Sequence, residues 1–366
     1  MHCKEIKGYL LAGLLCAGAL VVYGCAEEET GSGAAQALNY NGPGSKWDVS
    51  LADSGFTITM RETVDGPVAL TVEGTYERMA SGFLVLTVSG SEGEGGPDAG
   101  AQAWAVEVPG YALILKPMDA GSDQVIPMVV AGNCPADDVL ANWVMVKKAN
   151  TAAADDADRE FFGTFAYSTD TNTATLPMRR ALANAFQDAG AQALAGGACE
   201  SGIMTVEDAV MYLTSNGGAI VHTEVNNPDD GSFIFALSQK AIGAVGNLDA
   251  DYAGVLFDDS MTEGQKIQPV ALSCAAGACT GTIVTDVTTG ATSAESVTVT
   301  LDGDPDAFGN GLITGTIASG ADTGNLACMA DTGVLDSGRI MVSCIGQSPG
   351  DNSNMFNVLF TSIAGE

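Results

Sequence analysis

Short runs of β-branched and aromatic residues, separated by tight-turn signals, recur along most of the chain and constrain its fold more than any other feature. Two examples are WDVSLAD (47–53) and FTITMRE (56–62), with Asp-Ser-Gly between them. In the second run, Phe56, Ile58 and Met60 alternate with polar residues, which is the period of two expected of a half-buried strand. The sequence therefore predicts a mainly β protein with antiparallel β-sandwich or lipocalin-like β-barrel lobes.

The strand signals fall into two lobes. We expect an N-terminal β domain over 46–245 and a C-terminal β-sandwich or barrel domain over 246–366, with a boundary in AIGAVGNLDAD (241–251). About eight strand-like runs follow this boundary, with turn signals about every 8–14 residues. The run that opens this lobe, YAGVLFD (252–258), and the run that ends it, MFNVLFT (355–361), could pair and close a barrel.

One segment has helical character. Residues 178–195, MRRALANAFQDAGAQALA, are rich in Ala and lack β-branched residues, so their intrinsic propensity favours a helix. Apolar residues recur at helical spacing at Leu182, Phe186, Ala189 and Ala193. The sequence predicts one short helix here, ended by Gly196-Gly197.

The N-terminus has the organisation of an export signal. Lys4 and Lys7 precede an apolar run from Tyr9 to Val22. A membrane-spanning helix needs about 20 apolar residues to cross roughly 30 Å of hydrocarbon, and this run is shorter. Its length is typical of the hydrophobic region of a secretory signal peptide.

The run ends in Val22-Tyr23-Gly24-Cys25, which resembles the lipobox of bacterial lipoproteins. The resemblance covers only this segment. It implies that residues 1–24 are a signal peptide, that Cys25 is lipidated, and that the protein is anchored to a membrane through this lipid. An ordinary cleaved signal peptide and an uncleaved anchor are the alternatives. Residues 25–45, rich in Glu, Gly, Ala and Ser, are then a flexible lipid-anchored tether.

The residue after the lipidated Cys bears on location. In many Gram-negative lipoproteins an Asp at this position retains the protein at the inner membrane, and here the residue is Ala26. The resemblance therefore implies export to the outer membrane or the cell surface.

Six cysteines remain after the signal segment and Cys25 are set aside: Cys134, Cys199, Cys274, Cys279, Cys328 and Cys344. An even number in an exported protein predicts three disulfides, although sequence alone does not choose among the pairings. The preferred set joins Cys134 to Cys199, Cys274 to Cys279 and Cys328 to Cys344. The alternative of a zinc site lacks Cys-x2-Cys spacing and a neighbouring His.

The formal net charge of −31 excludes nucleic acid as a partner, because phosphates would be repelled. It suits cationic partners or divalent ions, and it also fits adaptation of an acidic surface to a salty environment. Hydrophobic residues make up 46% of the chain, which is enough to form a core and argues against disorder.

One acidic loop is a weak calcium candidate. In LDGDPDAFGN (301–310), Asp302, Asp304 and Asp306 repeat the start of a calcium-binding loop, and alternate carboxylates can converge on one hard cation. The pattern then departs from an EF-hand, because Ala307 stands at the Gly position. An acidic hairpin turn is the alternative. No other cofactor is indicated.

The sequence offers little from which a catalytic site could be built. Downstream of the signal segment the only histidine is His222, so any Ser–His–Asp triad would depend on it, and His-Glu-x-x-His does not occur. We therefore expect no catalytic residues and no enzyme. The expected function is a non-catalytic outer-membrane or cell-surface lipoprotein that binds a protein or glycan ligand. The alternatives are a structural component of the outer membrane or surface layer and, less favoured, a carboxylate-dependent glycan hydrolase.

Overall fold

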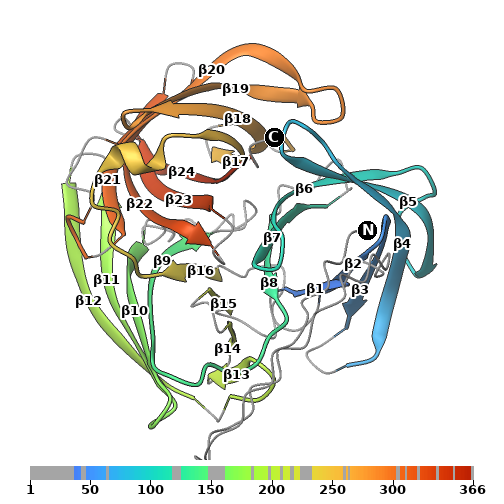
Figure 1. The fold of residues 1–366 in the computed structure, drawn as a ribbon, viewed down its shortest axis with the longest axis horizontal. Coiled ribbons are helices and arrows are strands. Elements are labelled where there is room, and N and C mark those ends of the chain that lie inside the picture. The colour runs from blue at the N-terminus through green and yellow to red at the C-terminus, as the bar shows by residue number, and fades with distance from the viewer. Residues whose placement is uncertain are drawn as a thin grey trace, which may run out of the picture. The chain divides into compact units, whose positions relative to one another are not determined.

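Three antiparallel β-sheets make up the part of the chain that the structure describes (Figure 1). This computed structural model of the 366-residue chain describes residues 37–42, 47–62, 66–117, 125–146, 161–182, 185–196, 199–206, 209–214, 218–222, 233–258, 261–262, 264–301, 306–309, 311–319, 322–334, 338–348 and 351–363. The predicted signal peptide, Cys25 and the tether up to residue 36 lie outside these ranges. So do Asp302 and Asp304.

The first sheet is a closed eight-stranded barrel, here called the N-terminal barrel, in which β1 pairs with both β2 and β8. Its strands are β1 (Leu38–Asn41), β2 (Trp47–Ala52), β3 (Gly55–Arg61), β4 (Val68–Arg78), β5 (Phe83–Gly93), β6 (Gln102–Val108), β7 (Ala112–Lys116) and β8 (Ile126–Val130).

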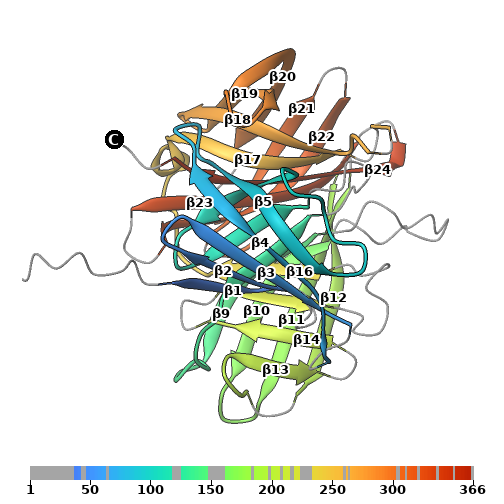
Figure 2. The same ribbon diagram turned by 90° about the vertical axis from the view of Figure 1, so that its right-hand side faces the viewer.

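The second sheet, here called the middle sheet, has eight strands in the order β12-β11-β10-β9-β16-β15-β14-β13. Figure 2 shows β9, β10 and β11 beside one another. The strands are β9 (Val139–Val146), β10 (Phe161–Ser168), β11 (Thr173–Leu182), β12 (Ala185–Ala195), β13 (Ile203–Val206), β14 (Ala209–Leu213), β15 (Ala219–His222) and β16 (Phe233–Ser238). Residues 46–245 thus contribute strands to two sheets.

The third sheet is a second closed barrel, the C-terminal barrel, preceded by the 3-10 helix η2 (Val245–Leu248) within the predicted boundary segment. Its strands are β17 (Asp251–Asp258), β18 (Ile267–Ala275), β19 (Ala278–Asp286), β20 (Ala291–Leu301), β21 (Leu312–Ser319), β22 (Asp322–Val334), β23 (Arg339–Ser348) and β24 (Asp351–Ser362). The predicted closure is confirmed, because β17 pairs with β24 from Tyr252↔Ser362 to Asp258↔Phe356.

The helix predicted over 178–195 is wrong. These residues belong to β11 and β12, which pair from Thr173↔Ala195 to Leu182↔Ala185. A bulge near Ala189 adds one residue to β12, so that Phe186 and Leu194 pack on opposite faces of the middle sheet. Pairing along the whole of β11, with Phe186 half-buried on one face and Leu194 buried on the other, therefore overrides a helix propensity that is worth only fractions of a kcal/mol per residue.

The tether predicted over 25–45 extends too far. Residues 38–41 form β1, and the Tyr40 side chain is fully buried in the N-terminal barrel. Four residues are too few to show a clear alternation of apolar and polar side chains. The Gly- and Pro-rich segment that follows also resembles a flexible linker. Only the closure of the barrel by pairing with both β2 and β8 makes this segment a strand.

Alternating side chains divide each barrel wall between a lumen and an outer face. Leu84, Leu86 and Leu113 fill the lumen of the N-terminal barrel, whereas Phe83 and Ile114 point outward. The outward residues share one core with side chains of the middle sheet, such as Phe235, and of the C-terminal barrel. Residues 35–366 form a single compact unit.

The three disulfides are the pairs preferred from the sequence: Cys134–Cys199, Cys274–Cys279 and Cys328–Cys344. The second links directly opposed residues of β18 and β19 next to a two-residue turn, in which Ala276 and Gly277 both have positive φ (52° and 82°). The third joins opposed residues of β22 and β23. Both of these pairs lie in the lumen of the C-terminal barrel.

In the part of the chain that the structure describes, no helix has the length and hydropathy needed to cross a membrane.

Candidate functional site

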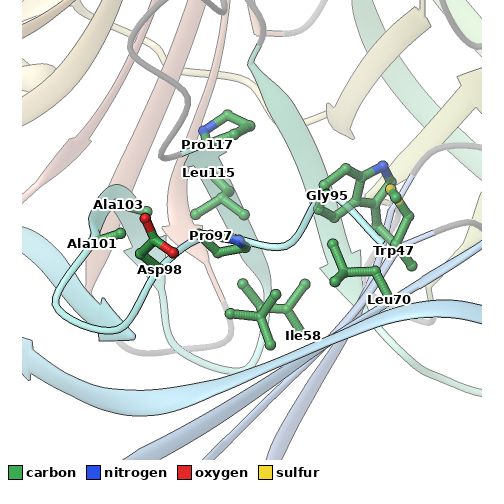
Figure 3. A pocket seen from close by; sticks show the side chains of 12 residues that line it. Trp47, Ile58, Leu70, Gly95, Pro97, Asp98, Ala101, Ala103, Leu115 and Pro117 are labelled. Atoms are coloured by element: carbon green, nitrogen blue, oxygen red, sulfur yellow. The ribbon is translucent and has the colours of Figure 1, made fainter. Parts of the chain in front are cut away.

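A cavity of about 540 Å³ opens at one end of the N-terminal barrel and is here called the barrel cavity. It lies where β2 begins, β3 ends and the connection between β5 and β6 crosses (Figure 3). Its lining residues are Trp47, Ile58, Met60, Leu70, Val72, Gly95, Pro97, Asp98, Ala101, Ala103, Leu115 and Pro117.

The strand pattern explains why these side chains meet. Ile58 and Met60 are alternate residues of β3, and their partners in β4 are Val72 and Leu70. Side chains two apart along a strand face the same side of a sheet. Two layers of apolar side chains therefore line the cavity wall, with Met60 and Leu70 nearer the open end.

Small residues leave the space open. The segment of β6 and the residue before it contribute Ala103 and Ala101 where the facing strands contribute larger side chains. One step further into the barrel the lumen is filled, because the Phe56 ring lies where a side chain on Gly74 would be. The two disulfides occupy the lumen of the C-terminal barrel, so the two barrels differ in their interiors although they have equal strand numbers.

The connection from Glu94 to Ala101 is folded back onto β5. The Ser91 hydroxyl donates to the Pro97 carbonyl at 3.0 Å, and the Gly100 and Ala101 amides donate to Val88 and Asp98 carbonyls at 2.9 and 3.0 Å. The sequence analysis gave this connection no role. Its Gly95, Pro97 and Asp98 are cavity residues that the sequence analysis missed, and no periodicity in a loop could have shown this.

The opposite end of the same barrel carries a buried polar network. Glu107 on β6 is 5% exposed and accepts hydrogen bonds from the Tyr40 hydroxyl at 2.7 Å and from the Arg78 Nε at 2.9 Å. Arg339 of β23 donates to the Glu107 carbonyl at 3.4 Å. Arg78, Glu107 and Arg339 border a smaller cleft of about 180 Å³.

Burial and neighbouring charge set the titration of this network. Burial, reinforced by the Glu107 carboxylate, raises the pKa of Tyr40 far above its usual range. Burial lowers the pKa of Arg339. For Arg78, burial acts downward, but the Glu107 charge and hydrogen bonds outweigh it and raise the pKa. The charges compensate one another within the protein, so this network is suited to holding strands together.

The predicted calcium loop has a structural role at the residues that are described. One Asp306 carboxylate oxygen accepts from the Gly311 amide at 2.7 Å and the Ile242 amide at 3.4 Å. The neighbouring Phe308 packs edge-on against Phe162 and Phe186 of the middle sheet. No cluster of metal-ligating side chains occurs among the described residues.

Neither of these two hollows brings together a pair of carboxylates on its described lining. The barrel cavity has Asp98, and the smaller cleft has Glu107. A glycoside hydrolase needs two acids about 5–10 Å apart flanking its substrate. His222 lies at the end of β15. On its described lining, neither hollow therefore presents the carboxylate pair of a glycoside hydrolase.

Comparison with protein-family models and with curated proteins finds no match. Among solved structures, the chain is similar to the crystal structure of isotype 1 transferrin binding protein B from serogroup B Neisseria meningitidis. That alignment has 9% sequence identity and a TM-score of 0.29, and it covers 87% of this chain and 66% of the other. A likeness at this level transfers neither ligand nor activity.

Proposed function

We propose that this protein is an exported, non-catalytic lipoprotein, anchored to the outer membrane through Cys25, that binds a ligand in the barrel cavity. The barrel cavity carries the proposal. Its 540 Å³ lie within the range of about 300–1,000 Å³ common for small-molecule sites. Barrels of about eight strands can hold one small ligand when side chains do not fill them.

A matched pair of variants tests binding at this site. Ala103 lines the cavity, and the neighbouring Gln102 on the same strand is exposed and bonds to Thr87. Ala103→Phe places a ring in the cavity, whereas Gln102→Phe places the same ring outside the barrel. Native mass spectrometry of protein purified from its own cells should show a non-covalent adduct in wild type and Gln102→Phe that Ala103→Phe lacks.

An adduct retained by a folded Ala103→Phe variant would contradict binding in the cavity. Binding would also be contradicted if the wild type carried no adduct and if its Tm did not rise on addition of any extract of the same cells.

Location is tested separately with intact cells. Protease treatment should remove the wild-type protein from the cell surface, and Cys25→Ser should be released from the membrane fraction. A wild type that is anchored but fully protected would place the protein inside the envelope and would contradict cell-surface exposure.

A structural role is the second candidate, and one observation favours it. β12 is an edge of the described middle sheet, eleven residues long, and most of its side chains are exposed. An exposed edge strand can pair with another copy of the chain, although the bulge near Ala189 interrupts it. Concentration-dependent assembly in analytical ultracentrifugation, abolished by Ala191→Pro, would support this role. A monomer at all concentrations would contradict it.

A further inference from the structure

The lining of the barrel cavity specifies the chemistry of its ligand. Of the twelve lining residues only Asp98 is charged, and the side chains that form the walls are hydrocarbon or thioether, apart from the indole of Trp47. A glycan or another polar ligand would lose hydrogen bonds to water on entering and gain few in return. The walls therefore select for an apolar group.

The shape of the site limits that group to a narrow one. The space lies inside a closed barrel of eight strands, between the layers of Ile58 and Met60 on one wall and Ala101 and Ala103 on another. Phe56 and the filled lumen beyond it close the inner end. A ligand must enter by the open end and lie along the barrel axis, which suits an unbranched chain.

Charged side chains around the open end of the cavity determine which polar group of the ligand can lie there. Asp98 and Glu94 are exposed on the connection between β5 and β6, and Glu92 is exposed near the end of β5. Among the described residues, the basic side chains near the rim are Lys116 and Arg61, and the Arg61 Nε lies 3.6 Å from an Asp48 carboxylate oxygen. The described part of the rim thus carries more acidic than basic groups, on a chain of net charge −31, and such a surface attracts cationic groups and repels anionic ones.

We infer that the barrel cavity binds a single unbranched aliphatic chain whose polar end is uncharged or positively charged. This inference rests on the proposed function and names the ligand class for the same site. It departs from the protein or glycan ligand expected from the sequence, because the wall offers hydrocarbon contact in place of hydrogen bonds.

Three twelve-carbon amphiphiles with different head groups test the inference. Titration calorimetry would use dodecyltrimethylammonium and dodecanoate below their micellar concentrations and dodecanol below its solubility limit, with the full mature chain carrying Cys25→Ser. We expect the first two to bind at one site and dodecanoate to bind at least tenfold more weakly. Replacing the dodecyl chain by decyl should weaken binding about 16-fold, because each buried CH₂ contributes about fourfold, or about 0.8 kcal/mol.

Variants connect the binding to the cavity. Ala103→Phe should abolish it and Gln102→Phe should preserve it, while Asp98→Lys should shift the preference toward dodecanoate. If Ala103→Phe does not fold, Ala101→Phe at the half-buried outer layer serves instead. Trp47 lines the cavity, so ligand should change the intrinsic fluorescence of the wild type and not that of Trp47→Phe.

Tighter binding of dodecanoate, equal binding of all three probes, or a folded protein that binds none of them would overturn the inference. The proposed function is contradicted by a different result, namely a native adduct that is absent from the wild type or that is retained by a folded Ala103→Phe variant. An adduct that is present but is identified as anionic or polar would reject the ligand class and leave binding in the cavity standing.

Discussion

Arg78 and Glu107 form an ion pair across the N-terminal barrel, with the arginine Nη2 2.8 Å and Nε 2.9 Å from the same carboxylate oxygen. The two ends of the pair differ, because the Arg78 side chain is 44% exposed and that of Glu107 is 4% exposed. The other Glu107 oxygen accepts the Tyr40 hydroxyl. A buried carboxylate is thus held by one partly solvated cation and one buried phenol.

Removing the Arg78 guanidinium should lower stability, because the Glu107 carboxylate is buried. Arg78→Ala leaves Glu107 with less compensation, and we expect a loss of about 1–2 kcal/mol in the free energy of unfolding, a figure reduced for the solvent exposure of Arg78. Urea denaturation measures it. Arg61→Ala is the control, because Arg61 and Asp48 are both more than a third exposed, and it should cost less than about 1 kcal/mol. Adding Glu107→Gln to Arg78→Ala should recover stability, and a further loss would contradict this account.

Stability should fall at alkaline pH. Burial, with neighbouring carboxylates, raises the pKa values of Tyr40, Tyr111 and Tyr252. The unfolded chain loses these phenolic protons above about pH 10 while the folded chain keeps them. The stabilisation is therefore complete below about pH 10 and decreases as the pH rises, by up to about 1.4 kcal/mol per pH unit for each tyrosine.

Urea midpoints measured from pH 8 to pH 12 give this slope. Tyr40→Phe should make it shallower by one tyrosine, even though the variant is less stable at neutral pH. An unchanged slope in Tyr40→Phe would show that Tyr40 ionises as readily in the folded protein as in the unfolded chain.

One glycine in the middle sheet should not tolerate a side chain. A Cβ on Gly163 of β10 would collide with the Pro177 carbonyl oxygen and lie 3.2 Å from the Trp143 Nε1. Because backbone must shift to relieve this, Gly163→Ala should cost about 1–3 kcal/mol. Gly90→Ala is the matched control, since nothing lies within 4 Å of its Cβ position. Thermal unfolding should show a lower Tm for Gly163→Ala alone, and equal Tm values would contradict the collision.

The disulfide that closes the longer loop should contribute more to the free energy of unfolding. Cys328–Cys344 spans 16 residues, so replacing both by Ala should cost about 3 kcal/mol from loop entropy. Cys274–Cys279 spans 5, and its removal should cost about 2 kcal/mol. Urea unfolding of the two double variants compares them, with reductant added to wild type as a further reference. A larger loss from the shorter loop would show that packing in the lumen outweighs loop entropy.

Much of the architecture could be predicted from the sequence. Alternation such as that of Phe56, Ile58 and Met60 marks strands reliably, because one face of each strand is buried. The pairing of β17 with β24 also follows from the order of the runs, and the observed disulfides are the preferred set among the pairings that six cysteines allow. Local pattern sufficed wherever burial repeats with a period of two.

The missed features depend on distant partners. β1 is a strand because β2 and β8 lie on either side of it, and residues 185–195 are a strand because β11 pairs along their whole length. The cavity escaped prediction for a related reason. Ala101 and Ala103 are unremarkable small residues until the barrel places them opposite Ile58 and Leu70, so an interior vacancy cannot be found along a single strand.

The position of β1 has a mechanical consequence. It is the first strand of the described residues, so a force pulling on the chain from its N-terminal side would act on the barrel through residues 38–41. Only two residues of β1, Tyr40 and Asn41, pair with β8. The barrel that contains the cavity is thus closed by a short stretch of pairing between β1 and β8. The hydrogen bond from Tyr40 to Glu107 also holds β1 in place. Force applied at residue 37 would therefore separate β1 from β8 and open the N-terminal barrel before it acted on the C-terminal barrel, which two disulfides cross-link.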